Sequence, residues 1–143
     1  MIDYEQMKIA KFNYWTLSLN QDQRYLGRTL LIANKKGDRS LADAEDHEIL
    51  EMRDVFVRVE NALRNLFQPD RFNYAQLGNE WQQLHIHIIP RYNSSIKFDD
   101  IEFLDKNQGK NYAPYEKFPV SENTMYKIRD AIKAELDKDS TKQ

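Results

Sequence analysis

The feature that most constrains this fold is the run from Gln83 to Arg91, in which polar and aliphatic residues alternate one by one. Polar side chains occupy positions 83, 85 and 87, and aliphatic side chains occupy positions 84, 86 and 88. A period of two with β-branched residues predicts a β-strand with one buried face and one polar face. Because successive side chains point to opposite faces, His85 and His87 share the polar face with Gln83. Pro90 lacks a backbone donor and is expected to end the strand.

Two of the three histidines of the chain lie on this one face, and three hypotheses explain them. The simplest is a pair of solvated histidines on an exposed sheet. The second is a metal site, because two histidines separated by one residue are a frequent ligand pair on strands, with a third ligand from Glu80 or an aspartate. The third is nucleophilic catalysis, because a neutral imidazole can attack phosphorus without a base beside it. At this point all three remain open.

Composition narrows the class of protein. The 143 residues, of which 41% are hydrophobic, fit a single domain over 1–143 with a sizeable core. A net charge of −2 from mixed charges gives no general attraction to nucleic acid or to an anionic membrane. The absence of cysteine excludes disulfides, thiol catalysis and cysteine-bound zinc. The sequence begins without a signal-like segment and has no membrane-length apolar run, so we expect a soluble cytoplasmic protein.

The remaining patterns predict an α+β fold, in which an antiparallel sheet of about five strands carries one long helix, followed by a C-terminal helix. Alternation and apolar spacing predict a core over 12–92, made of strands at 12–19, 26–33 and 71–77, a helix at 43–67 and the histidine strand. Residues 1–11 indicate a short helix or an arm. The tight loop 78–82 predicts an antiparallel hairpin between strand 71–77 and the histidine strand.

The segment His85-Ile86-His87-Ile88-Ile89-Pro90-Arg91 resembles the motif of the histidine triad (HIT) family of nucleotide hydrolases and transferases. That motif has three histidines separated by single apolar residues, then two apolar residues and often Pro-Arg. Matching the Pro-Arg end makes His87 the third histidine and His85 the middle, nucleophilic one. Gln83 then takes the place of the first histidine, as in a bacterial branch of the family that carries glutamine there.

The resemblance implies hydrolysis or transfer of a nucleoside monophosphate group from a conjugate such as a diadenosine polyphosphate or a nucleoside phosphoramidate. His85 would attack the α-phosphorus and form a covalent nucleotidyl-histidine. His87 would bind the phosphoryl oxygens. Gln83 can donate an amide hydrogen to phosphate but carries no positive charge, so Arg28 or Arg91 is expected to supply it.

The same resemblance suggests nucleotide contacts and marks departures from the family pattern. Asn20 matches an asparagine that contacts the nucleotide in the family, although a turn-forming role explains it equally well. Gly27-Arg28 stands where the family has Gly-His, and Gly78-Asn79 stands where it has Gly-Gln. Glu80 replaces a small hydroxyl residue of some members. Trp81 is interpreted either as a packing anchor or as a platform for a nucleobase.

The family also implies a homodimer that takes a nucleotide or dinucleoside polyphosphate and needs no metal cofactor, although magnesium can accompany such a substrate. Two alternatives stay open. One is a nucleotide-binding module with weak turnover, suggested by the departures at 79, 80 and 83. The other is a metal-dependent enzyme that uses His85 and His87.

Beyond the histidine strand the sequence is less specific. Residues 93–120 form a long polar loop, in which lysines lie beside Tyr112 and Tyr115. Such a loop is either a mobile surface segment or a cover for an anionic nucleotide. Apolar spacing after Ser121 predicts a C-terminal helix over 121–138. His47, in the first turns of the long helix and off its apolar stripe, is interpreted as a surface histidine.

Overall fold

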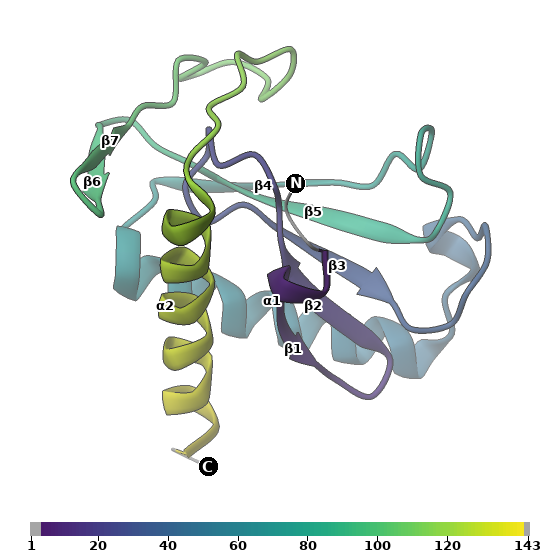
Figure 1. Cartoon of the computed structure of the whole chain (residues 1–143). Helices are drawn as coiled ribbons and strands as arrows, with labels where there is room; N and C mark the ends of the chain where they lie inside the picture. Colours follow the sequence, from purple (N-terminus) through teal and green to yellow (C-terminus); the bar gives the residue numbers. More distant parts are fainter. Residues whose placement is uncertain (1–3, 142–143) are drawn as a thin grey trace.

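The computed structural model describes residues 4–141, and their side chains up to residue 138. A five-stranded antiparallel sheet with the order β1-β2-β3-β5-β4 forms the centre of the molecule, and β6 and β7 form a separate hairpin (Figure 1). The α+β fold expected from the sequence is therefore confirmed. In chain order the elements are η1 Tyr4–Met7, β1 Lys8–Lys11, β2 Trp15–Leu19, β3 Thr29–Ala33, η2 Leu41–Asp43, α1 Asp46–Phe67, β4 Arg71–Ala75, β5 His85–Arg91, β6 Ile96–Phe98, β7 Ile101–Phe103 and α2 Glu122–Thr141.

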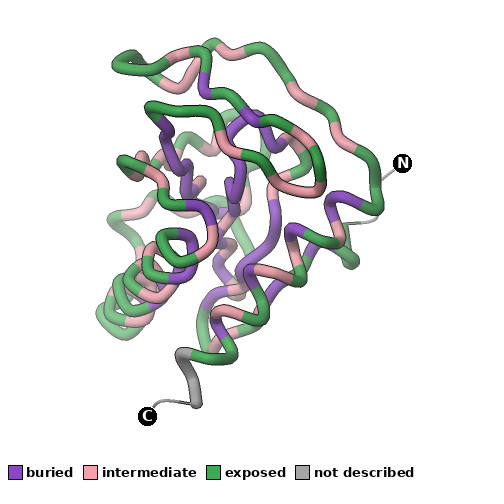
Figure 2. Tube along the Cα trace, turned by 90° about the vertical axis from the view of Figure 1, so that its left-hand side faces the viewer, coloured by how far each residue is buried: buried purple, intermediate pink, exposed green. Residues whose placement is uncertain are grey.

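Both long helices bury their apolar faces in one core with the sheet. Helix α1 starts with a capping box between Glu45 and Glu48, which satisfies free backbone donors at its first turn. Trp15 of β2 is fully buried and donates from Nε1 to the carbonyl oxygen of Glu48 at 2.8 Å, which ties the sheet to this helix. Helix α2 crosses α1, and the buried part of the trace lies where the elements meet (Figure 2). Buried on the two helices are Val55, Val59, Ala62, Leu63, Phe67, Met125, Ile128, Ile132 and Leu136.

Strand β5 has the two different faces that its alternation predicts. Leu84, Ile86 and Ile88 belong to the hydrophobic core, with exposed fractions of 1%, 3% and 0%. His85 and His87 therefore lie on the opposite face. β5 pairs with β3 on one side and with β4 on the other, so the expected hairpin with β4 is confirmed. Pro90 does not end the strand, because β5 continues to Arg91.

Two segments are more ordered than the sequence indicates. Residues 8–11 form the edge strand β1, where the sequence suggested a helix or an arm. Residues 96–103 of the expected long loop form the β6–β7 hairpin, whose two-residue turn has φ values of 53° at Asp99 and 60° at Asp100. Two positive φ angles in succession are the requirement of a tight hairpin turn, and aspartate tolerates them better than most residues. Helix α1 begins three residues later than predicted and α2 ends three residues later, at Thr141.

The segment 104–118, called the covering loop below, is bonded to the turn of residues 20–28 that leads into β3, called the entry turn. Arg24, itself buried, donates from Nε to the carbonyl oxygen of Glu116 at 2.7 Å. The amide of Phe118 donates to a carboxylate oxygen of Asp22 at 2.9 Å. The hydroxyl of Tyr25 donates to the carbonyl oxygen of Tyr112. The covering loop is therefore held against the sheet end, not left as a free surface segment.

Candidate active site

The His85 imidazole is held at one nitrogen by the backbone of its own strand. Its side chain is 7% exposed, and its Nδ1 lies 2.7 Å from the carbonyl oxygen of Gln83. A carbonyl oxygen only accepts, so Nδ1 carries the hydrogen and donates it. In the neutral ring the lone pair then resides on Nε2. The backbone thus sets His85 in the tautomer that a nucleophilic imidazole needs.

His87 is held in the opposite tautomer. Its ring lies 5.2 Å from that of His85, and Nη2 of Arg28 lies 3.1 Å from its Nδ1. A guanidinium only donates, so Nδ1 of His87 accepts and Nε2 carries the hydrogen. Burial, the charge of Arg28 and the neighbouring His85 lower the pKa of His87 from 6.5 to about 4. When both rings are neutral, the pair presents a lone pair on His85 and an N–H donor on His87.

The entry turn fixes the backbone position from which the Arg28 side chain extends. Gly27 has a φ of 92°, and a Cβ at this position would lie 2.8 Å from Cδ2 of Leu63 in α1. Both the left-handed backbone and the close approach of the helix require glycine here. The buried side chain of Gln23 accepts from the amide of Gly27 at 2.8 Å and donates to the carbonyl oxygen of Arg28 at 3.0 Å. These contacts fix the backbone on both sides of Arg28.

The Arg28 side chain is buried without an anionic partner. It is 4% exposed, and its guanidinium carbon lies 5.3 Å from the ring centroids of both Tyr112 and Tyr115 in the covering loop. Its Nε and Nη1 atoms have no hydrogen-bond partner in the described part of the chain. Within the described residues no carboxylate forms an ion pair with it. A positive charge therefore lies beside His87 uncompensated, which is costly unless an anion is bound nearby.

Gln83, expected to direct its amide toward phosphate, has a different set of partners. Its Nε2 donates to the carbonyl oxygens of Ala33 at 2.7 Å and Lys35 at 3.0 Å. Its Oε1 accepts from the amide of Gly37 at 3.1 Å. Both amide hydrogens are therefore used to hold the segment after β3. This corrects the expectation of a free amide donor at the first triad position.

The side chain of Arg91 likewise uses its donors for contacts within the protein. Its guanidinium forms an ion pair with the buried Asp105 at 2.7 Å, and it donates to Asn73 at 2.9 Å. The carbonyl oxygens of Asn107 and Lys110 accept its other hydrogens at 2.7 and 2.9 Å. Arg91 therefore holds the covering loop in place. Of the two arginines considered for the charge of the site, Arg28 is the one that contacts a histidine.

The other predicted nucleotide contacts fall into two groups. Asn20 lies in the entry turn and accepts from the amide of Asp22 at 3.0 Å, which is the turn-forming role considered for it. Trp81 is 48% exposed, and its ring lies 4.8 Å from that of His85. Its exposure does not fit a packing anchor, whereas its position beside a histidine fits a platform for a ligand. Asn79 and Glu80 are exposed in the loop that precedes β5.

Two neighbours of the histidines carried no separate signal in the sequence. Leu30 pairs with His87 and Ile32 pairs with His85 across the β3–β5 ladder, so these half-buried side chains share the histidine face. The uninterrupted apolar run Leu30-Leu31-Ile32-Ala33 conceals this division of faces. Tyr112 and Tyr115 stood out as loop tyrosines, but a contact with Arg28, 84 and 87 positions away, has no sequence signature.

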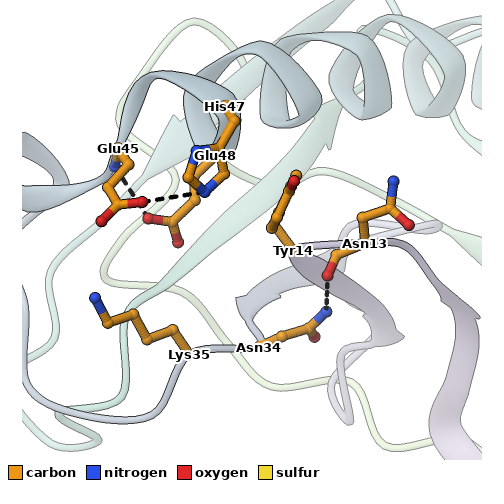
Figure 3. A pocket seen from close by; sticks show the side chains of 7 residues that line it. All are labelled: Asn13, Tyr14, Asn34, Lys35, Glu45, His47 and Glu48. Atoms are coloured by element: carbon orange, nitrogen blue, oxygen red, sulfur yellow. Dashed lines mark hydrogen bonds and ion pairs between the residues drawn. The ribbon is translucent and has the colours of Figure 1, made fainter.

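A cavity of about 270 Å³ lies apart from these residues, at the start of α1 (Figure 3). Glu45, His47 and Glu48 line one side of it, and Asn13, Tyr14, Asn34 and Lys35 line the other. Among the described residues, the three α1-end side chains are also the only group whose ligand atoms could surround a metal ion. Both carboxylate oxygens of Glu48 are bonded to Arg39, at 2.9 and 2.8 Å, and this pairing lowers the pKa of Glu48 to about 2. No third ligand of that kind joins His85 and His87 in the part described.

Residues 3–94 match the model of the HIT domain family, which covers more than half of the chain. The protein therefore belongs to the histidine triad family. No curated protein matches the sequence.

Solved histidine triad structures share the fold at low identity. A histidine triad protein from Marinobacter aquaeolei has a TM-score of 0.72 and 20% identity, over 92% of this chain and 88% of its own. One from Sinorhizobium meliloti has a TM-score of 0.72 and 18% identity, over 92% and 93%. A hypothetical histidine triad nucleotide-binding protein from Sulfolobus tokodaii has a TM-score of 0.69 and 17% identity, over 92% and 84%. Between residues 4 and 141, none of the helices is long and apolar enough to cross a membrane.

Proposed function

We propose that this protein hydrolyses or transfers the nucleoside monophosphate group of a nucleotide conjugate, such as a diadenosine polyphosphate or a nucleoside phosphoramidate. The observation that carries the proposal is the pair of opposite tautomers on β5. His85 offers a lone pair at Nε2, and His87 offers an N–H donor at Nε2. Nucleophile and phosphoryl-oxygen donor are the two roles that attack on an α-phosphate requires.

In the proposed reaction Nε2 of His85 attacks the α-phosphorus, and the bond to the leaving group breaks as the phosphorus–nitrogen bond forms. The leaving group departs with the electron pair and takes up a proton from solvent. Water then attacks the same phosphorus and gives up a proton to solvent as the phosphorus–nitrogen bond breaks, which releases the nucleoside monophosphate and returns the free imidazole. His87 donates from Nε2 to a phosphoryl oxygen in both steps, and the buried charge of Arg28 favours the negative charge that develops there.

The surroundings of the pair supply contacts for the rest of a nucleotide. Leu30 and Ile32 give an apolar surface beside the histidines, and the exposed ring of Trp81 gives a face for a base. On the family resemblance alone we also propose Asn20 and Asn79 as nucleotide contacts. The description of the Sulfolobus tokodaii relative as nucleotide-binding supports this substrate class.

The proposed chemistry needs no resident metal, because imidazole is the nucleophile, although magnesium can enter with a polyphosphate substrate. We further propose that the protein acts in the cytoplasm as a homodimer. Among the described residues, the outer sides of the edge strands β1 and β4 have no strand partner, and a second copy can cover such an edge. Light scattering at micromolar concentration tests the dimer, and a monomer would contradict it.

A nucleotide-binding protein with weak turnover is the second candidate. The observation that favours it is the commitment of both Gln83 amide hydrogens to the backbone of Ala33 and Lys35. The site then lacks the donor that the first triad histidine supplies in the family pattern. Turnover measured on diadenosine tetraphosphate and on adenosine phosphoramidate separates the two candidates.

The decisive test of the enzyme is His85→Ala, with His47→Ala as the matched control. His47 is exposed on α1 and lines the separate cavity, so its loss should leave turnover unchanged. His85→Ala should lower turnover on the order of 10³-fold or more while nucleotide binding persists. Rapid acid-free quenching of the wild-type reaction should trap a nucleotidyl-histidine at position 85. Near-normal turnover in His85→Ala would overturn the proposed function.

A further inference from the structure

The covering loop lies outside residues 3–94, the part of the chain that matches the family, yet its two tyrosines lie against Arg28. Arg28 also stands where the family pattern has histidine. A segment outside the family match thus meets Arg28 next to His87. Their meeting calls for an explanation in terms of the site.

We propose that Arg28 is a positioning residue, clamped between His87 and the rings of Tyr112 and Tyr115, which holds His87 in the Nε2–H tautomer. By this proposal the covering loop is part of the active site. The proposal rests on the function above for its catalytic meaning, but its structural content concerns the free protein.

The guanidinium of Arg28 contacts both His87 and the two tyrosine rings. Nη2 lies 3.1 Å from Nδ1 of His87, while the guanidinium carbon lies 5.3 Å from each tyrosine ring centroid. An arginine held by two aromatic faces loses rotamer freedom and keeps its planar fork in one orientation. An acceptor at Nδ1 then forces the hydrogen of the neutral ring onto Nε2.

Both sides of this clamp are anchored by further hydrogen bonds and ring contacts. The side chain of Arg28 extends from a backbone that is fixed by Gln23 and by the turn at Gly27. Tyr112 is held through its carbonyl oxygen, which accepts from Tyr25 and from Asn107. The ring of Tyr115 lies 5.6 Å from that of Tyr25. The entry turn therefore supports both the arginine and the tyrosines.

The charge of Arg28 has no anionic partner among the described residues. Its Nε and Nη1 lack hydrogen-bond partners there at 4% exposure, and no carboxylate forms an ion pair with it. The charged and titratable groups that act on His87 are Arg28, beside β3, and His85, on β5 itself. Arg28 and burial both disfavour a second proton on His87, so the ring stays a neutral donor while the positive charge of the site resides on the arginine.

The test is nuclear magnetic resonance of the three ¹⁵N-labelled imidazoles in the ligand-free protein, with His47, which lines the separate cavity, as an internal reference. In the wild type we expect His87 to be neutral at pH 6 with its hydrogen on Nε2. Arg28→Gln keeps a donor for Nδ1 but removes the charge, so the tautomer should persist while the titration midpoint of His87 rises toward 6.5. Arg28→Met removes both, so the midpoint should rise and the two tautomers should mix.

The loop is tested by the double variant Tyr112→Leu with Tyr115→Leu, which leaves Arg28 in the chain but removes its aromatic neighbours. It should produce the same mixing of tautomers to a smaller extent. An unchanged His87 tautomer in Arg28→Met would overturn the proposal, and an unchanged spectrum in the double variant would overturn the role of the loop. If Arg28→Met fails to fold, the rise in midpoint in Arg28→Gln decides the role of the charge.

Turnover then separates this proposal from the proposed function. If the enzyme works through His85, Arg28→Met should lower kcat on the order of 10²-fold with a smaller change in KM. If the wild type shows no turnover but the His87 spectrum responds to Arg28 as described, the function is wrong and the clamp is right. If turnover is present and the spectrum does not respond, the clamp is wrong and the function stands.

Discussion

Arg28 and Arg91 are two of the three buried arginines that contact the covering loop, and their side chains differ in how their hydrogens are used. Arg91 places all of its N–H donors on Asp105, Asn73 and two carbonyl oxygens. Arg28, equally buried, has one hydrogen bond, to His87, and two nitrogens without partners. A fully bonded arginine stabilises the fold and has nothing left to offer a ligand. An under-bonded one adds little stability and keeps its charge for chemistry, so bonding state, not burial, separates the two roles.

The largest expected effect is on stability at Arg91. Arg91→Met leaves the carboxylate of Asp105, in a side chain only 1% exposed, without its cation, and should lower the free energy of unfolding by about 3 to 5 kcal/mol. Arg28→Met leaves no buried carboxylate behind and should change it by about 1 kcal/mol or less. Urea denaturation of both variants measures the difference. Equal losses would remove the distinction between the two arginines.

The next effect is on the pH dependence of stability. The folded His87 has a pKa of about 4 against 6.5 for the ordinary residue, so the unfolded chain binds a proton first as the pH falls. Neutral His87 therefore contributes to the free energy of unfolding fully above pH 6.5. This contribution, up to about 3 kcal/mol, is lost as the pH falls from 6.5 to 4. His87→Asn should remove this part of the loss in urea titrations across that range, and Arg28→Met should make it smaller. Identical pH curves for wild type and His87→Asn would refute the lowered pKa.

A smaller effect is expected at the turn that delivers Arg28. Gly27→Ala brings a Cβ to 2.8 Å from Leu63 at a φ of 92°, and should cost about 2 kcal/mol. Gly109→Ala in the covering loop is the matched control. Its φ of 74° is also positive, but no atom lies within 4 Å of the added Cβ, so the cost should stay near about 1 kcal/mol. Thermal or urea unfolding measures both, and a larger loss at position 109 would contradict the clash with Leu63.

The sequence predicts the histidine strand well because the signal is local. A period of two assigns Leu84, Ile86 and Ile88 to the core and His85 to the other face, and the structure agrees. The long helix and the β4–β5 hairpin follow from equally local patterns. Family motif and fold then support each other, since the chain belongs to the histidine triad family.

What the sequence does not predict depends on contacts between distant residues. The different tasks of Arg28 and Arg91 follow from Tyr112 and Asp105, which adjoin them only after the covering loop folds back. Gln83 was expected at the phosphate because its strand position is right, but a glutamine also matches the free carbonyl oxygens after β3. Which acceptor binds the Gln83 amide depends on the three-dimensional structure, and the periodicity of the sequence does not predict it.

The most direct test is a crystal structure of the protein with adenosine monophosphate. We predict that the phosphorus lies about 3 to 3.5 Å from Nε2 of His85 and a phosphate oxygen within about 3 Å of Nε2 of His87, with Nη2 of Arg28 still bonded to Nδ1 of His87. A phosphate bound instead in the cavity beside Lys35, or a His87 ring turned so that Nδ1 faces the phosphate, would contradict it.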